Sequence, residues 1–150
     1  MQTLSRSGLQ IDLPDGWDGR IYQRAAEPGV VTRRALHAAS FALPPGLGDY
    51  ATAAVDMMSA ADVLVSVIEF DPASANTGLF RSQGVPAALG PDDFSPSAMP
   101  RAVPGRSASQ YFFSTGDRAF CLYVVLGSHA QRAALVPLVN AVVRTLQLGA

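Results

Sequence analysis

The 150-residue chain contains no lysine, so all 11 of its basic residues are arginine. Twelve acidic residues are interspersed with these arginines, and the formal net charge is only -1. Proteins that bind nucleic acid usually carry a basic patch or stripe, whereas the only adjacent basic residues here are Arg33 and Arg34. The charge pattern therefore argues against a nucleic-acid partner.

Cysteine is also scarce. Cys121 is the only one, so no disulfide can form within the chain. It falls between Phe120 and Leu122 in an expected strand, where a free cysteine behaves as a small buried apolar residue. The sequence therefore predicts a structural thiol and not a catalytic nucleophile.

Long apolar runs are missing as well. The longest apolar stretch, residues 119–127, is far too short to cross a bilayer. Residues 1–8 are followed by a polar and apolar alternation over 9–13, and not by the apolar core of a secretory signal. We therefore expect a soluble, cytoplasmic protein with no membrane span.

The motifs of the common catalytic and cofactor sites are absent too. The two histidines, His37 and His129, have no partner at the local spacing of a metal site. There is no G-x-S-x-G elbow, and Gly-Leu-Gly at 46–48 lacks the third glycine of a nucleotide-binding loop. The sequence predicts no catalytic residue, no cofactor and no metal.

What the chain does contain is a series of short strand patterns. Two of them flank Thr-Gly-Asp at 115–117, which is typical of a hairpin. The expected strands are residues 9–13, 20–24, 33–43, 62–70, 107–114 and 118–126. The pattern indicates a single α+β domain over 1–150, with an antiparallel sheet of five to six strands.

A helical pattern follows the last strand. Leu135, Leu138, Val139, Val142 and Leu146 form one apolar stripe. Pro137 suits a first helical turn, so either the regular helix begins near 136 and runs to 148, or a kinked helix begins as early as 128. We expect this amphipathic helix to pack on one face of the sheet. A weaker helical pattern lies within 49–60.

Residues 72–106, called the insertion below, hold six of the 11 prolines. Because proline cannot donate to a strand ladder, we expect this Pro/Gly-rich insertion to be irregular. Long irregular segments in a compact domain are often functional. The insertion could serve as a lid, a cover or an interface.

Several of the expected strands are apolar on both faces, and one helix covers only one of them. The insertion, a second subunit or a partner must cover the other face. Aromatic and methionine side chains suit adaptable protein interfaces. We therefore predict a partner-binding surface that includes Trp17, Met99, Tyr111 and Phe113.

Residues 9–17, Leu-Gln-Ile-Asp-Leu-Pro-Asp-Gly-Trp, resemble the opening of PsbP-like α+β domains, where a short strand runs into a Pro-x-Gly-Trp turn. The later hairpin and the C-terminal helix suit the same layout. The resemblance implies a binding domain and not an enzyme. Members of this fold group serve as photosystem subunits, as partners of small GTPases and as cytosolic chaperones for secreted bacterial effectors. The insertion departs from that pattern.

The first functional hypothesis is therefore a noncatalytic protein-binding module, an adaptor or chaperone, which we expect to be homodimeric. An alternative is a small enzyme or ligand-binding protein, with a pocket beneath the insertion and His37, Glu69 and Asp93 as its polar groups. A structural subunit of a larger assembly is the remaining alternative.

Overall fold

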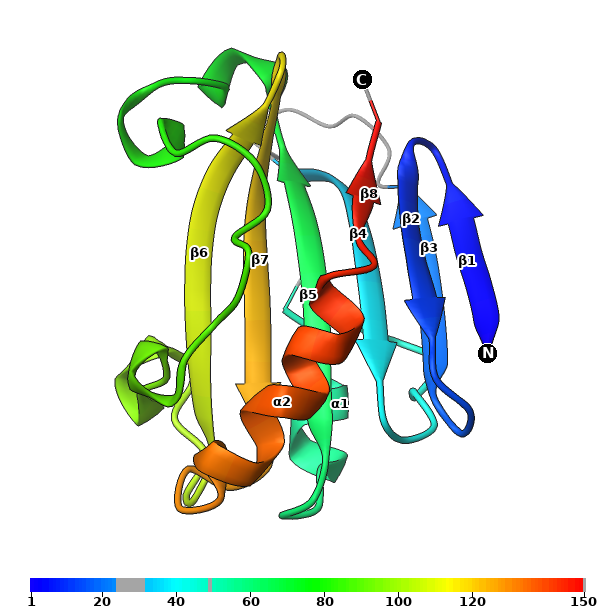
Figure 1. Ribbon diagram of the computed structural model, residues 1–150, viewed down its shortest axis with the longest axis vertical. Helices are drawn as coiled ribbons and strands as arrows, with labels where there is room; N and C mark the ends of the chain where they lie inside the picture. Colours follow the sequence, from blue (N-terminus) through cyan, green and yellow to red (C-terminus); the bar gives the residue numbers. More distant parts are fainter. Residues whose placement is uncertain (24–31, 49, 150) are drawn as a thin grey trace.

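The computed structural model describes residues 1–23, 32–48 and 50–149. The chain has an α+β fold with two antiparallel sheets and a C-terminal helix (Figure 1). The α+β class is confirmed. The prediction of a single sheet was wrong, because three short strands form a second one.

The larger sheet has the strand order β3-β4-β5-β7-β6. Its strands are β3 (Asp18–Gln23), β4 (Thr32–Ala39), β5 (Val63–Phe70), β6 (Ser107–Thr115) and β7 (Arg118–Leu126). Strand β7 has the predicted bounds, and β6 is one residue longer than predicted. Strand β4 ends at Ala39, four residues before the predicted end. The Ser40 amide still bonds Val63 O in register, but the Leu43 amide donates to the Asp18 side chain, so the chain has left the ladder there.

The smaller sheet has the order β1-β2-β8. It consists of β1 (Gln2–Arg6), β2 (Leu9–Leu13) and β8 (Gln147–Leu148). Ser7 and Gly8 join β1 to β2 with φ angles of 54° and 78°, a left-handed turn that suits glycine. Only β2 was predicted from the sequence.

The described residues form two α-helices, α1 (Thr52–Met57) and α2 (Arg132–Val143). Helix α2 begins before Pro137 and ends five residues earlier than 148. The Thr145 hydroxyl donates to Val142 O and accepts the Asp12 amide, so it closes the helix and joins its end to β2. The chain can then turn back into β8.

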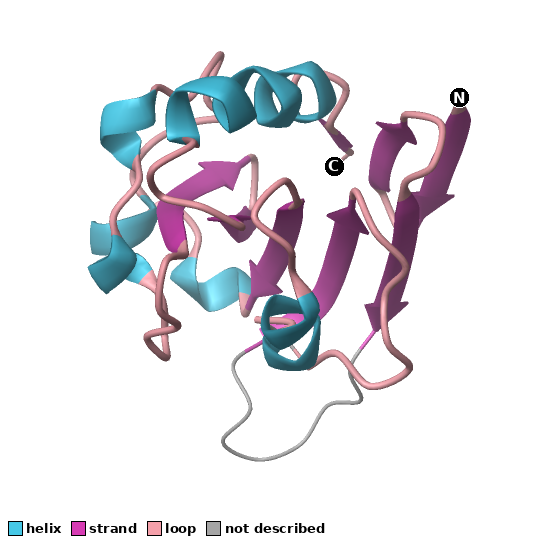
Figure 2. Ribbon diagram, turned by 90° about the horizontal axis from the view of Figure 1, so that it is seen from below, coloured by secondary structure: helices cyan, strands magenta, loops and turns pink. Residues whose placement is uncertain are grey.

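The five-stranded sheet is covered on both faces by the chain itself (Figures 1 and 2). Helix α2 and strand β2 cover one side, called the α2 face. Helix α1 covers the other side, called the α1 face. Each face has its own buried apolar cluster. The sequence left open whether the insertion, a second subunit or a partner covers the second face. In the structure, segments of the chain itself cover both faces.

The insertion contributes to both clusters. It contains four 3-10 helices of three residues each, at 72–74, 78–80, 91–93 and 96–98. Leu89 and Phe94 join the cluster of the α2 face, whereas Met99 joins that of the α1 face. Asn140 of α2 fixes the insertion by exchanging two hydrogen bonds of 2.9 Å with the backbone of Leu89.

Candidate functional site

The four residues predicted for a partner surface do not lie together. Tyr111 and Phe113 share one face of β6, with ring centroids 5.9 Å apart. Phe113 is 0% exposed and Met99 is 8% exposed, in the cores of opposite faces. Trp17 is half-buried beside β3, the edge strand opposite β6. Phe113 and Met99 are therefore core residues in this structure, which corrects their placement on a surface.

The polar groups of the alternative pocket are also separated. His37 points to the α1 face, Glu69 lies on the α2 face, and Asp93 is exposed in the insertion, where it accepts the Gly90 amide. The cavity beneath residues 99–103 of the insertion, against Tyr123, has a volume of about 20 Å³. That space holds about one water molecule. The pockets found among the described residues are not lined by any of the three predicted groups.

The side chains of His37 and Ser66 are within hydrogen-bond distance of each other, as a catalytic base and its nucleophile would be. The Nδ1 atom of His37 lies 2.6 Å from Ser66 Oγ, and its Nε2 atom lies 3.1 Å from Gly48 O. Both side chains are 0% exposed, so no substrate reaches the hydroxyl. The pair joins β4 to β5 inside the sheet and has a structural role.

Cys121 is buried in β7, as predicted. Burial raises the pKa of its thiol to about 12, so the thiol is protonated at neutral pH. Because the thiolate is the nucleophilic form, this cysteine is inert.

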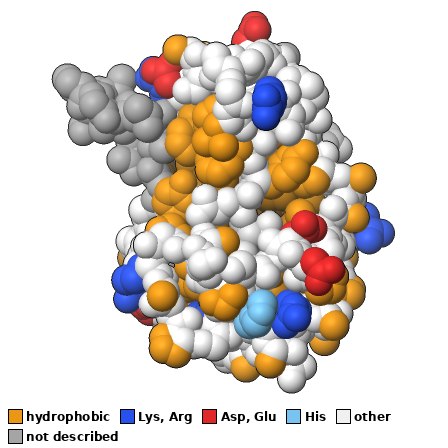
Figure 3. Space-filling view, turned by 90° about the vertical axis from the view of Figure 1, so that its left-hand side faces the viewer, with side chains coloured by type: hydrophobic (Ala, Val, Ile, Leu, Met, Phe, Trp, Pro, Cys, Tyr) orange, Lys and Arg blue, Asp and Glu red, His pale blue; other side chains and the backbone are white. Residues whose placement is uncertain are grey.

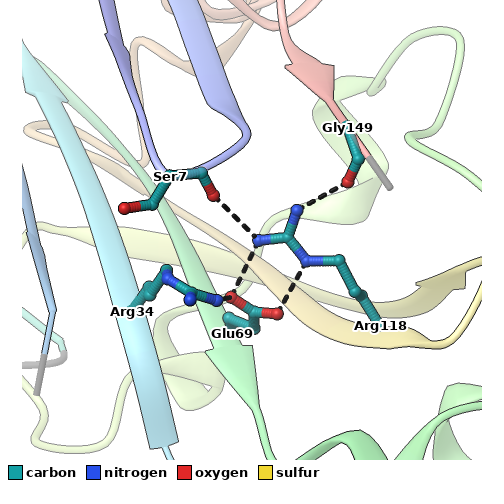
Figure 4. Close-up of polar contacts among 5 residues, drawn as sticks. All are labelled: Ser7, Arg34, Glu69, Arg118 and Gly149. Atoms are coloured by element: carbon teal, nitrogen blue, oxygen red, sulfur yellow. Dashed lines mark hydrogen bonds and ion pairs between the residues drawn. The ribbon is translucent and has the colours of Figure 1, made fainter. Parts of the chain in front are cut away.

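A cluster of charges is buried at one end of the α2 face (Figure 4). Glu69 of β5 accepts hydrogen bonds from Arg118 Nε at 2.7 Å and Nη2 at 2.9 Å, and from Arg34 Nη1 at 2.9 Å. Arg118 also donates to Gly149 O and Ser7 O, so one guanidinium joins β7 to both the β1–β2 turn and the chain end. Burial acts to raise the pKa of Glu69, but the hydrogen bonds and positive charges of Arg118 and Arg34 outweigh it and lower that pKa.

This cluster fastens the small sheet onto the large one. Its carboxylate is already bonded on both oxygens, and the Glu69 side chain is only 3% exposed. One feature of the sequence pointed to this cluster: by strand alternation Glu69 shares a face with Val63, Val65 and Val67. An acidic residue at such a buried position needs a paired charge. Both oxygens of the Glu69 carboxylate are thus engaged in holding the two arginines.

The open edge of β6 is the feature that the sequence did not reveal. In an antiparallel pair, alternate residues direct their backbone groups to the neighbouring strand and away from it. Ala108 and Ser114 point theirs away from β7: Ala108 exchanges two hydrogen bonds with Ser95, and Ser114 bonds Ser82 O and the Gly84 amide. Gln110 and Phe112 have the same orientation. Among the residues that the structure describes, nothing bonds their two amides and two carbonyls.

Between the two points where the insertion bonds β6, this edge lacks the usual sequence features that protect an edge strand. Strand β6 has no charged residue and no proline, and its register with β7 is continuous over all nine residues. Exposed edge strands are normally guarded by charge, proline or a bulge. Figure 3, viewed from the β6 side, shows apolar surface on either side of a paler band of polar and backbone atoms.

Aromatic side chains flank the open groups on both faces. Tyr111 is half-buried on the α2 face, where it packs against that face's core. Phe112 is half-buried on the α1 face, with its ring centroid 5.6 Å from that of Phe80 and 6.3 Å from that of Phe70. The arrangement can bind an extended backbone through the edge and apolar side chains through its two flanks.

Other classes of site were sought in the described part of the chain. It contains no group of three or more histidine, cysteine, aspartate or glutamate residues that could hold a metal ion. None of the helices found there is long and apolar enough to span a membrane. Comparisons with protein-family models, curated proteins and solved structures gave no match to this chain.

Proposed function

We propose that this protein is a noncatalytic protein-binding module that captures an extended segment of a partner protein at the edge of β6. The observation that carries the proposal is the set of four backbone groups of Gln110 and Phe112 that point outward without a described partner. An extended peptide can bond such groups by adding a strand to the sheet.

The surroundings of this edge favour a binding role over an enzymatic one. The side chains best suited to chemistry, His37, Ser66 and Cys121, are buried, and Glu69 is bonded on both oxygens. By contrast, the backbone groups of β6 are flanked by two half-buried aromatic rings. Such a module suits the cytoplasmic adaptor or chaperone role that the PsbP-like resemblance implies.

A matched pair of substitutions at Gln110 tests the proposal. Proline removes the outward amide and places its ring on the edge, and it leaves the β6–β7 ladder intact because that amide does not face β7. Alanine keeps the amide. Both variants lose the bond from Gln110 Nε2 to Ala98 O, so their difference isolates the backbone group.

Peptides are selected from a displayed random library on the immobilised protein, and their affinities are measured for the wild type and both variants. We expect Gln110→Ala to bind like the wild type and Gln110→Pro to lose about tenfold or more, the loss expected from one hydrogen bond and a blocked edge. Thermal unfolding of both variants checks that they are folded. Equal affinity for the proline variant, or a library that yields no binder, would contradict the proposal.

A further inference from the structure

The open part of the β6 edge has a defined length. Ser95 pairs with Ala108 in the antiparallel sense, which places Phe94 opposite Ser109. Gln83 pairs with Ser114 in the parallel sense, which places Ser82 opposite Phe113. The chain therefore occupies both ends of the edge itself, and the window left open is opposite residues 110–112. At about 3.4 Å per residue, this window takes three residues of an added strand.

The length of the window selects the direction of the added strand. In an antiparallel strand of three residues, the first and third exchange both of their hydrogen bonds with Phe112 and Gln110, and all four open groups are bonded. A parallel strand would bond two of the groups through its middle residue. It would need further residues opposite Ser109 and Phe113 for the other two, where Phe94 and Ser82 already lie.

The same register assigns the side chains of the added strand. The first and third residues point to the α1 face, beside Phe112 and its neighbours Phe70 and Phe80. The middle residue points to the α2 face beside Tyr111, as a non-hydrogen-bonded pair in which side chains come closest. Because β6 offers no charge to pair with, an apolar middle residue fits this position best.

A second copy of the chain cannot fill this window with its β6 strand. Its own β6 is nine residues long, in continuous register and without proline. If this strand paired with the window, its residues beyond the central three would collide with the insertion. They would meet Ser82 and Gln83 at one end and Phe94 and Ser95 at the other. The occupant must instead bend away from the sheet after three residues, as a short stretch in a loop or tail can.

We propose that the partner supplies a three-residue extended stretch, which pairs with β6 in the antiparallel sense and has an uncharged, apolar middle residue. This inference rests on the proposed function. The N–H groups of the first and third residues of the stretch bond the edge. The N–H group of its middle residue points away.

The test uses acetyl-threonyl-leucyl-threonine N-methylamide as the probe, added to the full, isotopically labelled protein and followed by NMR. We expect the amide signals of Gln110 and Phe112 to shift most, because their N–H groups face the probe. N-methylation of leucine should leave the Kd within about twofold, whereas N-methylation of either threonine should weaken it about tenfold through a lost hydrogen bond. Gln110→Pro should abolish the shifts and Gln110→Ala should retain them.

Each other outcome overturns the inference. If N-methylation of leucine weakens binding and N-methylation of either threonine does not, the added strand is parallel to β6. Shifts away from β6, or none up to the solubility limit of the probe, would show that the window does not take this stretch. The library selection tests the proposed function separately. If selected peptides bind the wild type but not Gln110→Pro, the proposed function stands even when the tripeptide does not bind.

Discussion

Glu69 shows at the scale of one residue how a buried charge can be structural. Its carboxylate replaces the water lost on burial with three hydrogen bonds from two guanidinium groups. Removing one partner of such a cluster leaves uncompensated charge in the interior, which costs more than the intact cluster contributes. The arginines that surround Glu69 also join parts of the chain that are far apart in sequence, so its loss should be felt in the whole fold.

We predict that Glu69→Gln lowers the free energy of unfolding by about 3–5 kcal/mol at neutral pH. The pKa of Glu69 is lowered in the folded protein. Its contribution is therefore complete above the unfolded pKa, about 4.3, and is lost as the pH falls through the folded value. Urea unfolding across this acidic range should show the gap between the wild type and variant closing as the pH falls.

The control for this prediction is Asp71→Asn. Asp71 pairs with Arg33 at 2.9 Å, but both side chains are more than a third exposed. Solvent weakens such a pair, so the loss at neutral pH should be much smaller than for Glu69→Gln. Equal losses in the two variants would mean that burial of the cluster has no part in its effect.

At the scale of elements, the strands with strong alternation were predicted well, and those defined by their neighbours were not. Strand β7 was predicted correctly because nearly every residue of it is apolar and a glycine turn precedes it. Strand β1 is polar and exposed and exists through its pairing with β2, whereas β8 has two residues. The end of α2 was missed for the same kind of reason, because Thr145 closes it through a bond to β2.

The junction where β7 ends carries the next prediction. The Gly127 amide donates to Asp62 O at 2.8 Å, and a Cβ atom there would lie 1.9 Å from Ser59 O. Gly127→Ala must therefore push the backbone of β7 away from the turn that precedes β5. We expect a loss of about 1–3 kcal/mol in the free energy of unfolding, measured by chemical denaturation.

Gly46→Ala is the matched control for that change. A Cβ atom at Gly46 meets nothing within 4 Å, and its φ lies outside the left-handed region. Its stability should equal that of the wild type or exceed it slightly, because alanine reduces the freedom of the unfolded chain. A stable Gly127→Ala protein would show that this junction moves at little cost.

At the scale of the whole molecule, the sequence indicated an aromatic surface on the last hairpin but could not tell which of its residues face solvent. In the structure Tyr111 and Phe113 lie on one face of β6, but Phe113 is buried and Tyr111 is half-buried. Whether β6 is central or at an edge depends on where the insertion passes, and its contacts with Ala108 and Ser114 join residues distant in sequence. The open window is a consequence of those contacts, so no local pattern encodes it.

The insertion also protects the rest of the edge, which gives a prediction about assembly. Ser95 has a φ of -145°, whereas proline fixes φ near -65° and has no amide to bond Ala108 O. Ser95→Pro should therefore lift this segment from β6 and lengthen the open edge, and unguarded edges pair with other copies. We expect the proline variant to self-associate at lower concentration than the wild type in sedimentation velocity.

Ser95→Ala separates this effect from loss of the side chain. It removes the hydroxyl contact with Ser97 but keeps the backbone amide, so it should sediment like the wild type. Adding Gln110→Pro to Ser95→Pro should reduce the association, because a second proline interrupts the same edge. If Ser95→Pro sediments like the wild type while folded, the insertion's bond to Ala108 is not what prevents self-association at the β6 edge.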